Sequence, residues 1–258
     1  MESAMDEILS LREGGVLTLT FNRAEKKNAL TSAMYARLAA QLAEADADAA
    51  VRLAVIQGQE TLFTAGNDVT EFLQRPPADA DAPVFRFLRA LADFSKPLLA
   101  AVCGPAVGIG TTLLLHCDLV YCGDNALFSL PFVNLGLCPE AASSLLLPQR
   151  IGVAAAAEKL LFGEAFAADE AEALGLVNRV LPPSEVNAFT QAQARKLADK
   201  PAASLQATKA LLRGPQRPAV HAAIATEAAE FERLLRGPAA KEAFGAFLAK
   251  RKPDFSNC

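Results

Sequence analysis

One carboxylate in an otherwise uncharged segment is the first side chain whose setting could support chemistry. Glu140 is the only charged residue in residues 128–149. Apolar surroundings disfavour the charged form of a carboxyl group, which raises its pKa and suits it to exchange protons near neutral pH. The sequence therefore predicts that Glu140 acts as an acid–base group.

Two glycine-containing segments could supply hydrogen-bond donors to such a reaction. Residues 63–68 carry Gly66, and residues 101–112 carry Gly104, Gly108 and Gly110. Glycine permits tight turns and close approach of a ligand, and the start of a helix leaves backbone N–H groups free. One N–H group from each segment, converging on one oxygen, would make an oxyanion hole. Close packing of a strand, a turn and a helix would explain the same glycines equally well.

The elements expected to position these residues alternate between strands and helices. Short β-branched or apolar runs predict strands at 16–21, 51–56, 98–102 and 119–122, and Thr31 is placed to cap a helix that carries Met34 and Leu38. A further helix is expected at 84–94, after a loop at 76–83. Beyond residue 183 only helical patterns follow, at 184–198, 202–213, 218–235 and 239–250. This order favours an α/β body with a helical tail.

Composition excludes several classes of protein. The 258 residues are 52% hydrophobic and 21% charged, so a disordered chain is excluded. The formal net charge of −4 argues against nucleic-acid binding, which needs a basic surface. High apolarity also suggests interfaces between subunits.

The cysteines, the histidines and the N-terminal residues set further expectations. Five cysteines contain no CxxC pair and Met1 to Glu7 lack a basic targeting segment, so we expect a reduced, cytoplasmic protein. Residues 97–115 are uncharged, but Gly104-Pro105 interrupts them, which predicts a strand, a turn and a helix rather than a membrane span. The two histidines lie far apart, and no metal site is expected.

Four motifs together identify a family. They are Phe-Asn-Arg-Ala-Glu-Lys-Lys-Asn-Ala-Leu at 21–30, the two glycine-containing segments, Ala-Leu-Gly-Leu-Val-Asn at 173–178 and Phe-Leu-Ala-Lys-Arg-Lys-Pro-Asp-Phe at 247–255. Over nearly the whole chain, the sequence resembles the enoyl-CoA hydratase/isomerase (crotonase) superfamily. The resemblance implies a crotonase-like spiral of ββα units. It places the α/β core in residues 1–197 and a helical trimerisation region in 198–258, so that the chain forms a homotrimer or a hexamer.

The resemblance also implies a site for an acyl-CoA thioester. The main-chain N–H groups of Asn67 and Ile109 are expected to hold the thioester oxygen, with Glu140 as the third catalytic residue. Coenzyme A is part of the substrate, and no other cofactor and no metal are expected. The substrate-binding residues that the resemblance implies are Arg23, Lys26, Ala65, Gly66, Asp68, Gly108, Gly110, Thr112, Phe132, Leu135 and Lys252, with the basic ones near the phosphates.

Two substitutions separate this chain from the hydratases of the family. The positions of the two hydratase glutamates hold Thr112 and Phe132, neither of which is a carboxylate. The run Leu-Gly-Leu-Cys-Pro-Glu at 135–140 instead resembles the peroxisomal-type Δ3,Δ2-enoyl-CoA isomerases, in which the glutamate moves a proton from C2 to C4. An isomerase of unsaturated fatty acyl-CoA is therefore expected. Other enolate chemistry (hydratase, thioesterase or dehalogenase type) and a non-catalytic acyl-CoA-binding protein stay as alternatives.

Overall fold

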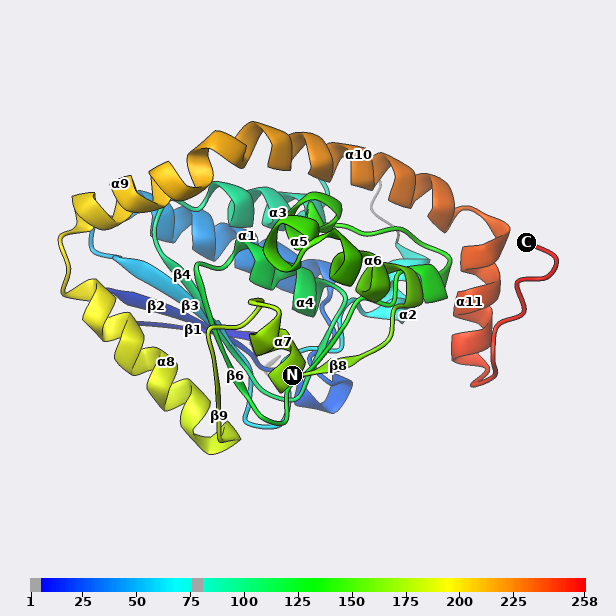
Figure 1. The fold of residues 1–258 in the computed structure, drawn as a ribbon, viewed down its shortest axis with the longest axis horizontal. Helices are drawn as coiled ribbons and strands as arrows, with labels where there is room; N and C mark the ends of the chain where they lie inside the picture. The colour runs from blue at the N-terminus through cyan, green and yellow to red at the C-terminus, as the bar shows by residue number, and fades with distance from the viewer. Residues whose placement is uncertain (1–5, 76–80) are drawn as a thin grey trace, which may run out of the picture.

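The computed structural model describes residues 6–75 and 81–258, and a six-stranded sheet forms its centre (Figure 1). The strand order is β1-β2-β3-β4-β6-β9, with β1 antiparallel to β2 and every other pair parallel. The strands of this sheet are β1 (Ile8–Glu13), β2 (Val16–Phe21), β3 (Leu53–Gln57), β4 (Leu98–Val102), β6 (Leu119–Gly123) and β9 (Arg179–Leu181).

The apolar runs form strands here because helices cover both faces of the sheet. All five residues of β4 are buried, as expected for a central parallel strand. Alternate side chains enter two cores: Leu17 and Leu19 belong to the larger one, whereas Val16, Val55 and Leu99 belong to the smaller one. The larger core contains side chains of α1 and α3, and the smaller core contains side chains of α8.

Helices pack on the faces of the large sheet and form most of the C-terminal third. Thr31 caps the first helix, where its hydroxyl accepts a hydrogen bond from the Met34 N–H group, as the sequence predicted. The helices are α1 (Ser32–Ala47), α2 (Val69–Gln74), α3 (Pro83–Asp93), α4 (Ile109–Thr112), α5 (Ser143–Ile151), α6 (Val153–Phe162), α7 (Ala168–Ala173), α8 (Pro183–Ala198), α9 (Ala202–Arg213), α10 (Arg217–Leu235) and α11 (Pro238–Leu248), with short 3₁₀ turns η1 (Ala24–Lys26), η2 (Leu113–His116), η3 (Val133–Leu135) and η4 (Gly214–Gln216).

A second, smaller sheet lies beside the first and supports the glycine-containing segments. It consists of β5 (Pro105–Val107), β7 (Leu127–Ser129) and β8 (Phe166–Ala167), in the order β5-β7-β8. The chain passes from β4 of the large sheet directly to β5 of the small one at Gly104. This glycine has a φ of 65°, and a Cβ atom there would lie 2.0 Å from the Thr61 carbonyl oxygen. The turn between the two sheets thus requires glycine.

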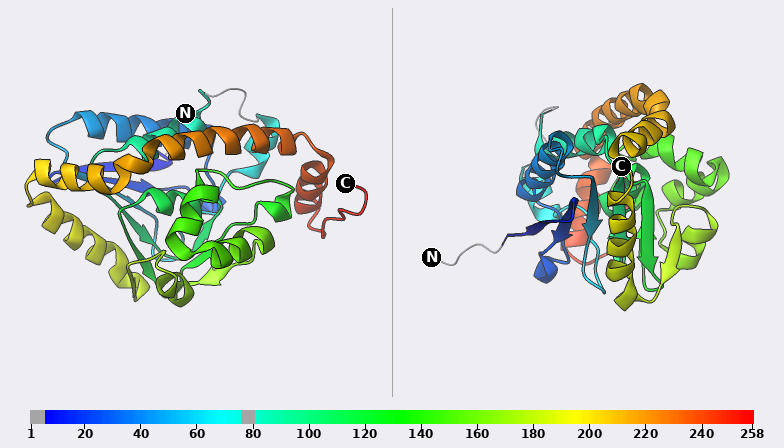
Figure 2. Two further views of the ribbon diagram at one scale, coloured as in Figure 1. Left: turned by 45° about the horizontal axis from the view of Figure 1, so that its top comes forward. Right: turned by 90° about the vertical axis from the view of Figure 1, so that its left-hand side faces the viewer.

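The C-terminal helices lie along the α/β body (Figure 2). Figure 2 shows α9 and α10 following one another along one side of the molecule, with α11 turning away at the end. Side chains of α10, including Val220 and Ile224, belong to the larger core. The division at residues 197 and 198 and the trimerisation role stay predictions.

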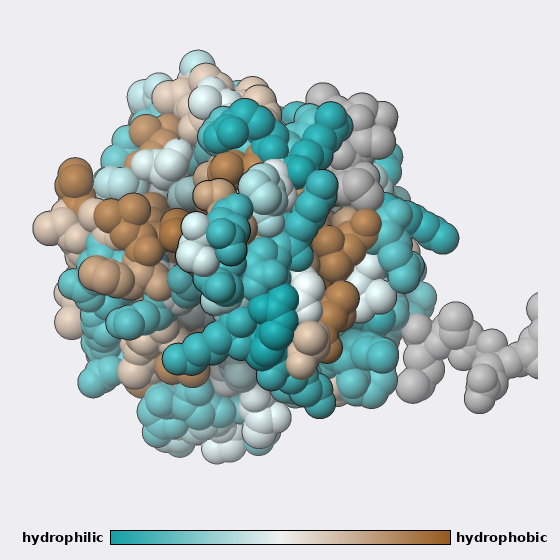
Figure 3. Space-filling model, turned by 90° about the vertical axis from the view of Figure 1, so that its right-hand side faces the viewer, coloured by the Kyte–Doolittle hydropathy of each residue, from teal (hydrophilic) through white to brown (hydrophobic). Residues whose placement is uncertain are grey.

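Several large apolar side chains are exposed on α6 and α11. On the face that carries α11, apolar patches alternate with polar ones (Figure 3). Leu161 and Phe162 of α6 and Phe247 and Leu248 of α11 are each more than half exposed. Such side chains are compatible with the predicted contacts between subunits.

The sequence-based elements agree with most of this structure. The strands expected at 16–21, 98–102 and 119–122 and the four C-terminal helices are confirmed, apart from one- or two-residue differences at their ends. The uncharged stretch 97–115 is divided among β4, β5, α4 and η2, and none of the helices described is long and apolar enough to cross a membrane. Residues 76–80 of the expected loop lie outside the described residues. The edge strand β1 was not predicted.

Candidate active site

The two glycine-containing segments lie side by side and run in the same direction. The Thr64 N–H group donates to the Pro105 carbonyl oxygen at 2.9 Å, and the Val107 N–H group donates to the Thr64 carbonyl oxygen at 3.0 Å. Thr64 and Ala106 therefore form a parallel bridge. Asn67 and Ile109 each follow this bridge by three residues, so the pairing carries both of them to the same end of the two segments.

Both predicted oxyanion donors are free in this arrangement. Among the described residues, the N–H groups of Asn67 and Ile109 donate to no recorded acceptor, whereas the neighbouring Gly108 N–H group donates to the Ser129 carbonyl oxygen at 2.9 Å. Ile109 is the first residue of α4, where a helix leaves its N–H group unpaired. Gly66 has a φ of 88°, and a Cβ atom there would lie 2.9 Å from the Val107 carbonyl oxygen. The close contact between the segments thus requires glycine at position 66.

Glu140 is hydrogen-bonded to Thr112, which lies one helical turn after Ile109 in α4. The Thr112 hydroxyl, at the end of α4, donates to Glu140 Oε1 at 2.5 Å. Glu140 is half-buried and lines a pocket. The pKa of Glu140 is raised to about 8: burial is the main cause, the Thr112 hydrogen bond opposes the rise, and the charge of Glu227 adds to it. Burial is therefore the main physical cause of the raised pKa that the sequence predicted for Glu140.

A small, mostly apolar pocket brings Glu140 and Asn67 together. Apolar side chains form most of its wall, and Glu227 is the second carboxylate in its lining. The aromatic rings of Phe72 and Phe231 pack edge to face at 5.9 Å between α2 and α10. The full lining is Asn67, Phe72, Val84, Phe85, Leu88, Glu140, Ala141, Ile224, Glu227, Ala228 and Phe231.

A buried tyrosine contacts the side chain of Asn67. The Tyr35 hydroxyl on α1 donates to Asn67 Oδ1 at 2.5 Å, and Tyr35 is 4% exposed. Burial raises the pKa of Tyr35 above its usual value, and the charge of Glu140 raises it as well. Tyr35 therefore stays protonated and orients the Asn67 side chain at the edge of the pocket.

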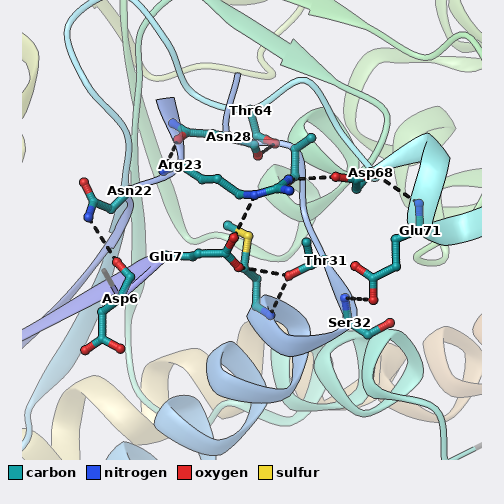
Figure 4. A network of polar contacts seen from close by, with 12 residues as sticks. Asp6, Glu7, Asn22, Arg23, Asn28, Thr31, Ser32, Thr64, Asp68 and Glu71 are labelled. Carbon is teal, nitrogen blue, oxygen red and sulfur yellow. Dashed lines mark hydrogen bonds and ion pairs between the residues drawn. The ribbon is translucent and has the colours of Figure 1, made fainter. Parts of the chain in front are cut away.

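Arg23 bonds to two carboxylates of its own chain, and its role at a phosphate stays a prediction. Figure 4 shows its guanidinium group between two carboxylates: Nε lies 2.7 Å from Glu7, and Nη1 lies 2.8 Å from Asp68. Nη1 also donates to the Ala29 carbonyl oxygen. Burial alone would raise the pKa of Asp68, but the hydrogen bonds and charge of Arg23, together with the N–H groups at the start of α2, lower it. Arg23 and Asp68 thus fix the loop after Asn67.

The other residues predicted to bind substrate fall into two groups. Ala65, Gly108, Thr112, Phe132 and Leu135 lie in the segments around the free N–H groups, and a Cβ atom at Gly110 would meet Thr64. Thr112 contacts Glu140 rather than open space. Lys26 and Lys252 are exposed, and neither has an ion-pair partner among the described residues. Their contacts with coenzyme A phosphates stay predictions.

Sequence reasoning missed three residues that the fold brings to the site. Tyr35, Phe231 and Glu227 lie on α1 and α10, outside every motif in the sequence. Glu227 carried a weak signal, because it is an acidic residue on the helix that also carries the buried Val220 and Ile224. Its spacing of seven and three residues from Val220 and Ile224 places it on the same helix face, but nothing in the sequence indicated what its carboxylate would contact.

Solved structures of known class share this architecture. A structure described as Pseudomonas aeruginosa OdaA matches with a TM-score of 0.92 and 48% identity, over 94% of this chain and 99% of that chain. An enoyl-CoA hydratase/isomerase from Pseudoalteromonas atlantica T6c matches with a TM-score of 0.93 and 38% identity, over 97% and 100% of the two chains. The fold is therefore the crotonase-like α/β fold that the motifs predicted.

The sequence gives the same assignment at the level of the family. Residues 12–257 match the sequence model described as "Enoyl-CoA hydratase/isomerase", and the chain belongs to this family. Enoyl-CoA delta isomerase 2 of Rattus norvegicus is 41% identical over 83% of this chain, which spans 56% of the rat protein. The 2,3-dehydroadipyl-CoA hydratase of Escherichia coli is 36% identical over 97% of this chain and 99% of its own length. Relatives of both reaction types thus resemble the chain.

Proposed function

We propose that the protein is a Δ3,Δ2-enoyl-CoA isomerase that acts on unsaturated fatty acyl-CoA through one carboxylate. The observation that carries this proposal is the placement of Glu140, whose carboxyl group lines the same pocket as Asn67 and has a pKa raised to about 8. The identity to a delta isomerase of the rat supports the proposal.

The chemistry follows from the acidity of the substrate. In a 3-enoyl thioester, the C2 proton is acidified by the carbonyl group and by the double bond. Glu140 removes this proton, and the N–H groups of Asn67 and Ile109 stabilise the dienolate oxygen. The same carboxyl group then returns the proton to C4, which moves the double bond to C2. Each such N–H donor stabilises a transition state by about 3 kcal/mol.

The apolar wall of the pocket suits a hydrocarbon chain next to Glu140. Phe72, Phe85 and Phe231 line it together with aliphatic side chains. These side chains bind an acyl tail and keep water away from the carboxyl group. The reaction requires no redox cofactor and no metal, and coenzyme A enters as part of the substrate. The exposed apolar side chains of α6 and α11 support a homotrimer or a hexamer.

Hydration of a 2-enoyl thioester is the second candidate, because a hydratase is among the full-length relatives. The hydratase mechanism of this family needs two carboxylates around a water molecule. Here the corresponding positions are Thr112, which donates to Glu140, and Phe132, which is 6% exposed. Glu227 also lines the pocket, but its oxygens accept hydrogen bonds from Ala142 and Ser144. Isomerisation therefore fits these residues better.

A panel of three thioesters tests the proposal. Purified protein is incubated with a 3-enoyl-CoA, a 2-enoyl-CoA and a saturated acyl-CoA, and conjugated product, hydrated product and free thiol are measured. We expect conjugated 2-enoyl-CoA from the first substrate, with far slower hydration and no hydrolysis. Faster hydration or hydrolysis would contradict the proposal, and tight binding without turnover would support a non-catalytic protein.

A further inference from the structure

The backbone directly after Glu140 adopts an unusual conformation. Ala141 and Ala142 both have positive φ values, of 61° and 57°. Residues other than glycine rarely adopt this left-handed conformation, and two in succession require support from their surroundings. Because Ala141 is the next residue in the chain, the geometry of this turn decides where the Glu140 carboxyl group lies.

The same turn begins α5 without a cap of its own. Ala142 is the N-cap residue of this helix, and its methyl side chain accepts no hydrogen bond. Serine, threonine, asparagine or aspartate would normally satisfy the free N–H groups at this position. The start of α5 therefore depends on an acceptor from elsewhere in the chain.

Glu227 of α10 supplies this acceptor from 85 residues away. Its Oε2 accepts a hydrogen bond from the Ala142 N–H group at 2.6 Å. Its Oε1 accepts from the Ser144 N–H group at 2.9 Å and from the Ser144 hydroxyl at 2.5 Å. A negative charge at this place also complements the positive end of the helix dipole.

His116 holds the opposite side of the turn. Its Nε2 lies 2.8 Å from the Ala141 carbonyl oxygen. Burial lowers the pKa of His116 to about 4, so the ring is neutral at pH 7 and its Nε2–H group donates to this carbonyl. The peptide group between Ala141 and Ala142 is thus bonded at both ends, by His116 at the carbonyl and by Glu227 at the N–H group.

We infer that Glu227 is a positioning residue for the proposed proton transfer: it fixes the left-handed turn that carries Glu140 and keeps a second negative charge at the pocket. Glu227 is 7% exposed, and among the described residues it forms no ion pair. Its partners are neutral N–H and O–H groups: burial raises the pKa of Glu227, and these hydrogen bonds favour its ionised form against that rise.

Several titratable groups surround the two carboxylates. From the loop before α5 these are Glu140 itself and Cys138, whose thiol lies 3.8 Å from the Glu227 carbonyl oxygen. Tyr35 of α1 faces Glu140, and His116 of η2 contacts the turn. On α10, Glu230 and Arg233 pair with each other at the surface. None of these groups is a cation in contact with Glu227, so replacement of Glu227 by a neutral residue should make Glu140 easier to ionise.

The inference rests on the proposed function only for its kinetic readout, so the main test needs no substrate. The carboxyl groups of glutamate are labelled with ¹³C, Glu140 is assigned with the Glu140→Gln variant, and its titration is followed by NMR in wild type and in Glu227→Gln. The exposed Glu230→Gln on the same helix is the matched control. We expect Glu227→Gln to lower the Glu140 midpoint by about one pH unit and to speed hydrogen exchange at the Ala142 and Ser144 amides, with Glu230→Gln unchanged.

Kinetics and a conservative variant complete the test. With a 3-enoyl-CoA, at a pH where Glu140 is ionised in both proteins, kcat of Glu227→Gln should fall about tenfold while KM changes less than about twofold. Glu227→Asp keeps the charge but shortens the side chain, so it should speed amide exchange and leave the Glu140 midpoint near that of wild type. This variant also carries the test if Glu227→Gln does not fold.

Two outcomes separate this inference from the proposed function. If wild type shows no isomerisation, the proposed function is wrong, while titration and exchange still decide the role of Glu227. If the Glu140 midpoint and both amide exchange rates are the same in wild type and Glu227→Gln, or in Glu227→Asp the exchange is unchanged, the positioning role is overturned.

Discussion

Two carboxylates on either side of the predicted oxyanion hole differ in the partners that the fold provides. Asp68 directly follows Asn67 and is bonded to the Arg23 guanidinium group at 2.8 Å and to the Glu71 N–H group at 3.1 Å. Glu140 shares a pocket with Asn67, but within residues 6–75 and 81–258 the hydrogen-bond partner of its carboxyl group is the Thr112 hydroxyl alone. The pKa of Asp68 is lowered, whereas that of Glu140 is raised to about 8.

This difference assigns the two side chains to different tasks. A carboxylate with a cationic partner stays ionised and stabilises the loops that it joins. A carboxylate among apolar groups binds a proton over most of the neutral range and can therefore transfer it. The ion pair thus marks Asp68 as a structural acid, and the raised pKa next to Asn67 marks Glu140 as the acid expected to do chemistry.

The largest expected effect comes from removing each carboxylate in turn. Glu140→Gln should lower kcat for isomerisation by about 10³-fold, because the amide cannot accept the C2 proton, while acyl-CoA binding stays near that of wild type. Asp68→Asn should keep kcat within about tenfold of wild type, since it removes one ion pair outside the reaction. Steady-state kinetics and calorimetric binding of a saturated acyl-CoA check both. Equal losses of kcat in the two variants would contradict the different roles assigned to Glu140 and Asp68.

The pH dependence of the reaction should follow Glu140. Since the base must be ionised, kcat/KM should rise about tenfold per pH unit below pH 8 and level off above it. The measurement is a pH–rate profile in buffers of constant ionic strength. A profile that is already flat from pH 5 to pH 7 would contradict the raised pKa.

Stability should depend on pH in the opposite way at the two sites. Asp68 has a lowered pKa, so its ion pair stabilises the fold above pH 3.8 and this contribution is lost as pH falls through the folded-state pKa. Asp68→Asn should therefore lower the free energy of unfolding by about 2 kcal/mol at pH 7.

Glu140 has a raised pKa, so the stability that it contributes below pH 4.5 is lost as pH rises towards 8. Glu140→Gln should flatten this dependence, as urea unfolding at several pH values would show.

The smallest expected effect concerns the hydroxyl that bonds to Glu140. Thr112→Val keeps the shape of the side chain but removes the hydrogen bond, which lowers the pKa of Glu140 in the wild type. The pH–rate profile should shift upward by about half a pH unit, with a few-fold lower kcat/KM at pH 7. Thr111→Val is a matched neighbour, because the Thr111 hydroxyl donates to the Ala106 carbonyl oxygen instead. A shift in the Thr111 variant but not in the Thr112 variant would contradict this assignment.

The sequence indicated the parts of the fold whose signal is local. Apolar runs predicted β2, β4 and β6 because central parallel strands are buried on both faces. Only Ile8 of β1 is buried, so this edge strand has no such run. Strands of two or three residues, such as β8, are too short to produce a pattern.

In the candidate site, too, the sequence predicted the residues that have a local signal and not the contacts that form across the fold. Glu140 stood out because no other charge lies near it in sequence, and the family motifs indicated Asn67 and Ile109. The partners of Arg23 and the position of Glu227 depend on tertiary contacts over 45 and 85 residues, which no local spacing reveals. The sequence therefore revealed neither the carboxylates that pair with Arg23 nor the N–H groups that bond to Glu227.

Deuterium transfer within one substrate molecule tests the single-carboxylate shuttle most directly. A 3-enoyl-CoA deuterated at C2 is converted in ordinary water, and the product is analysed for deuterium at C4. Because apolar side chains form most of the pocket wall next to Glu140, we expect a measurable share of the C2 deuterium at C4, and about 10³-fold slower product formation by Glu140→Gln. Hydrogen from water alone at C4, together with retained turnover in Glu140→Gln, would contradict the account.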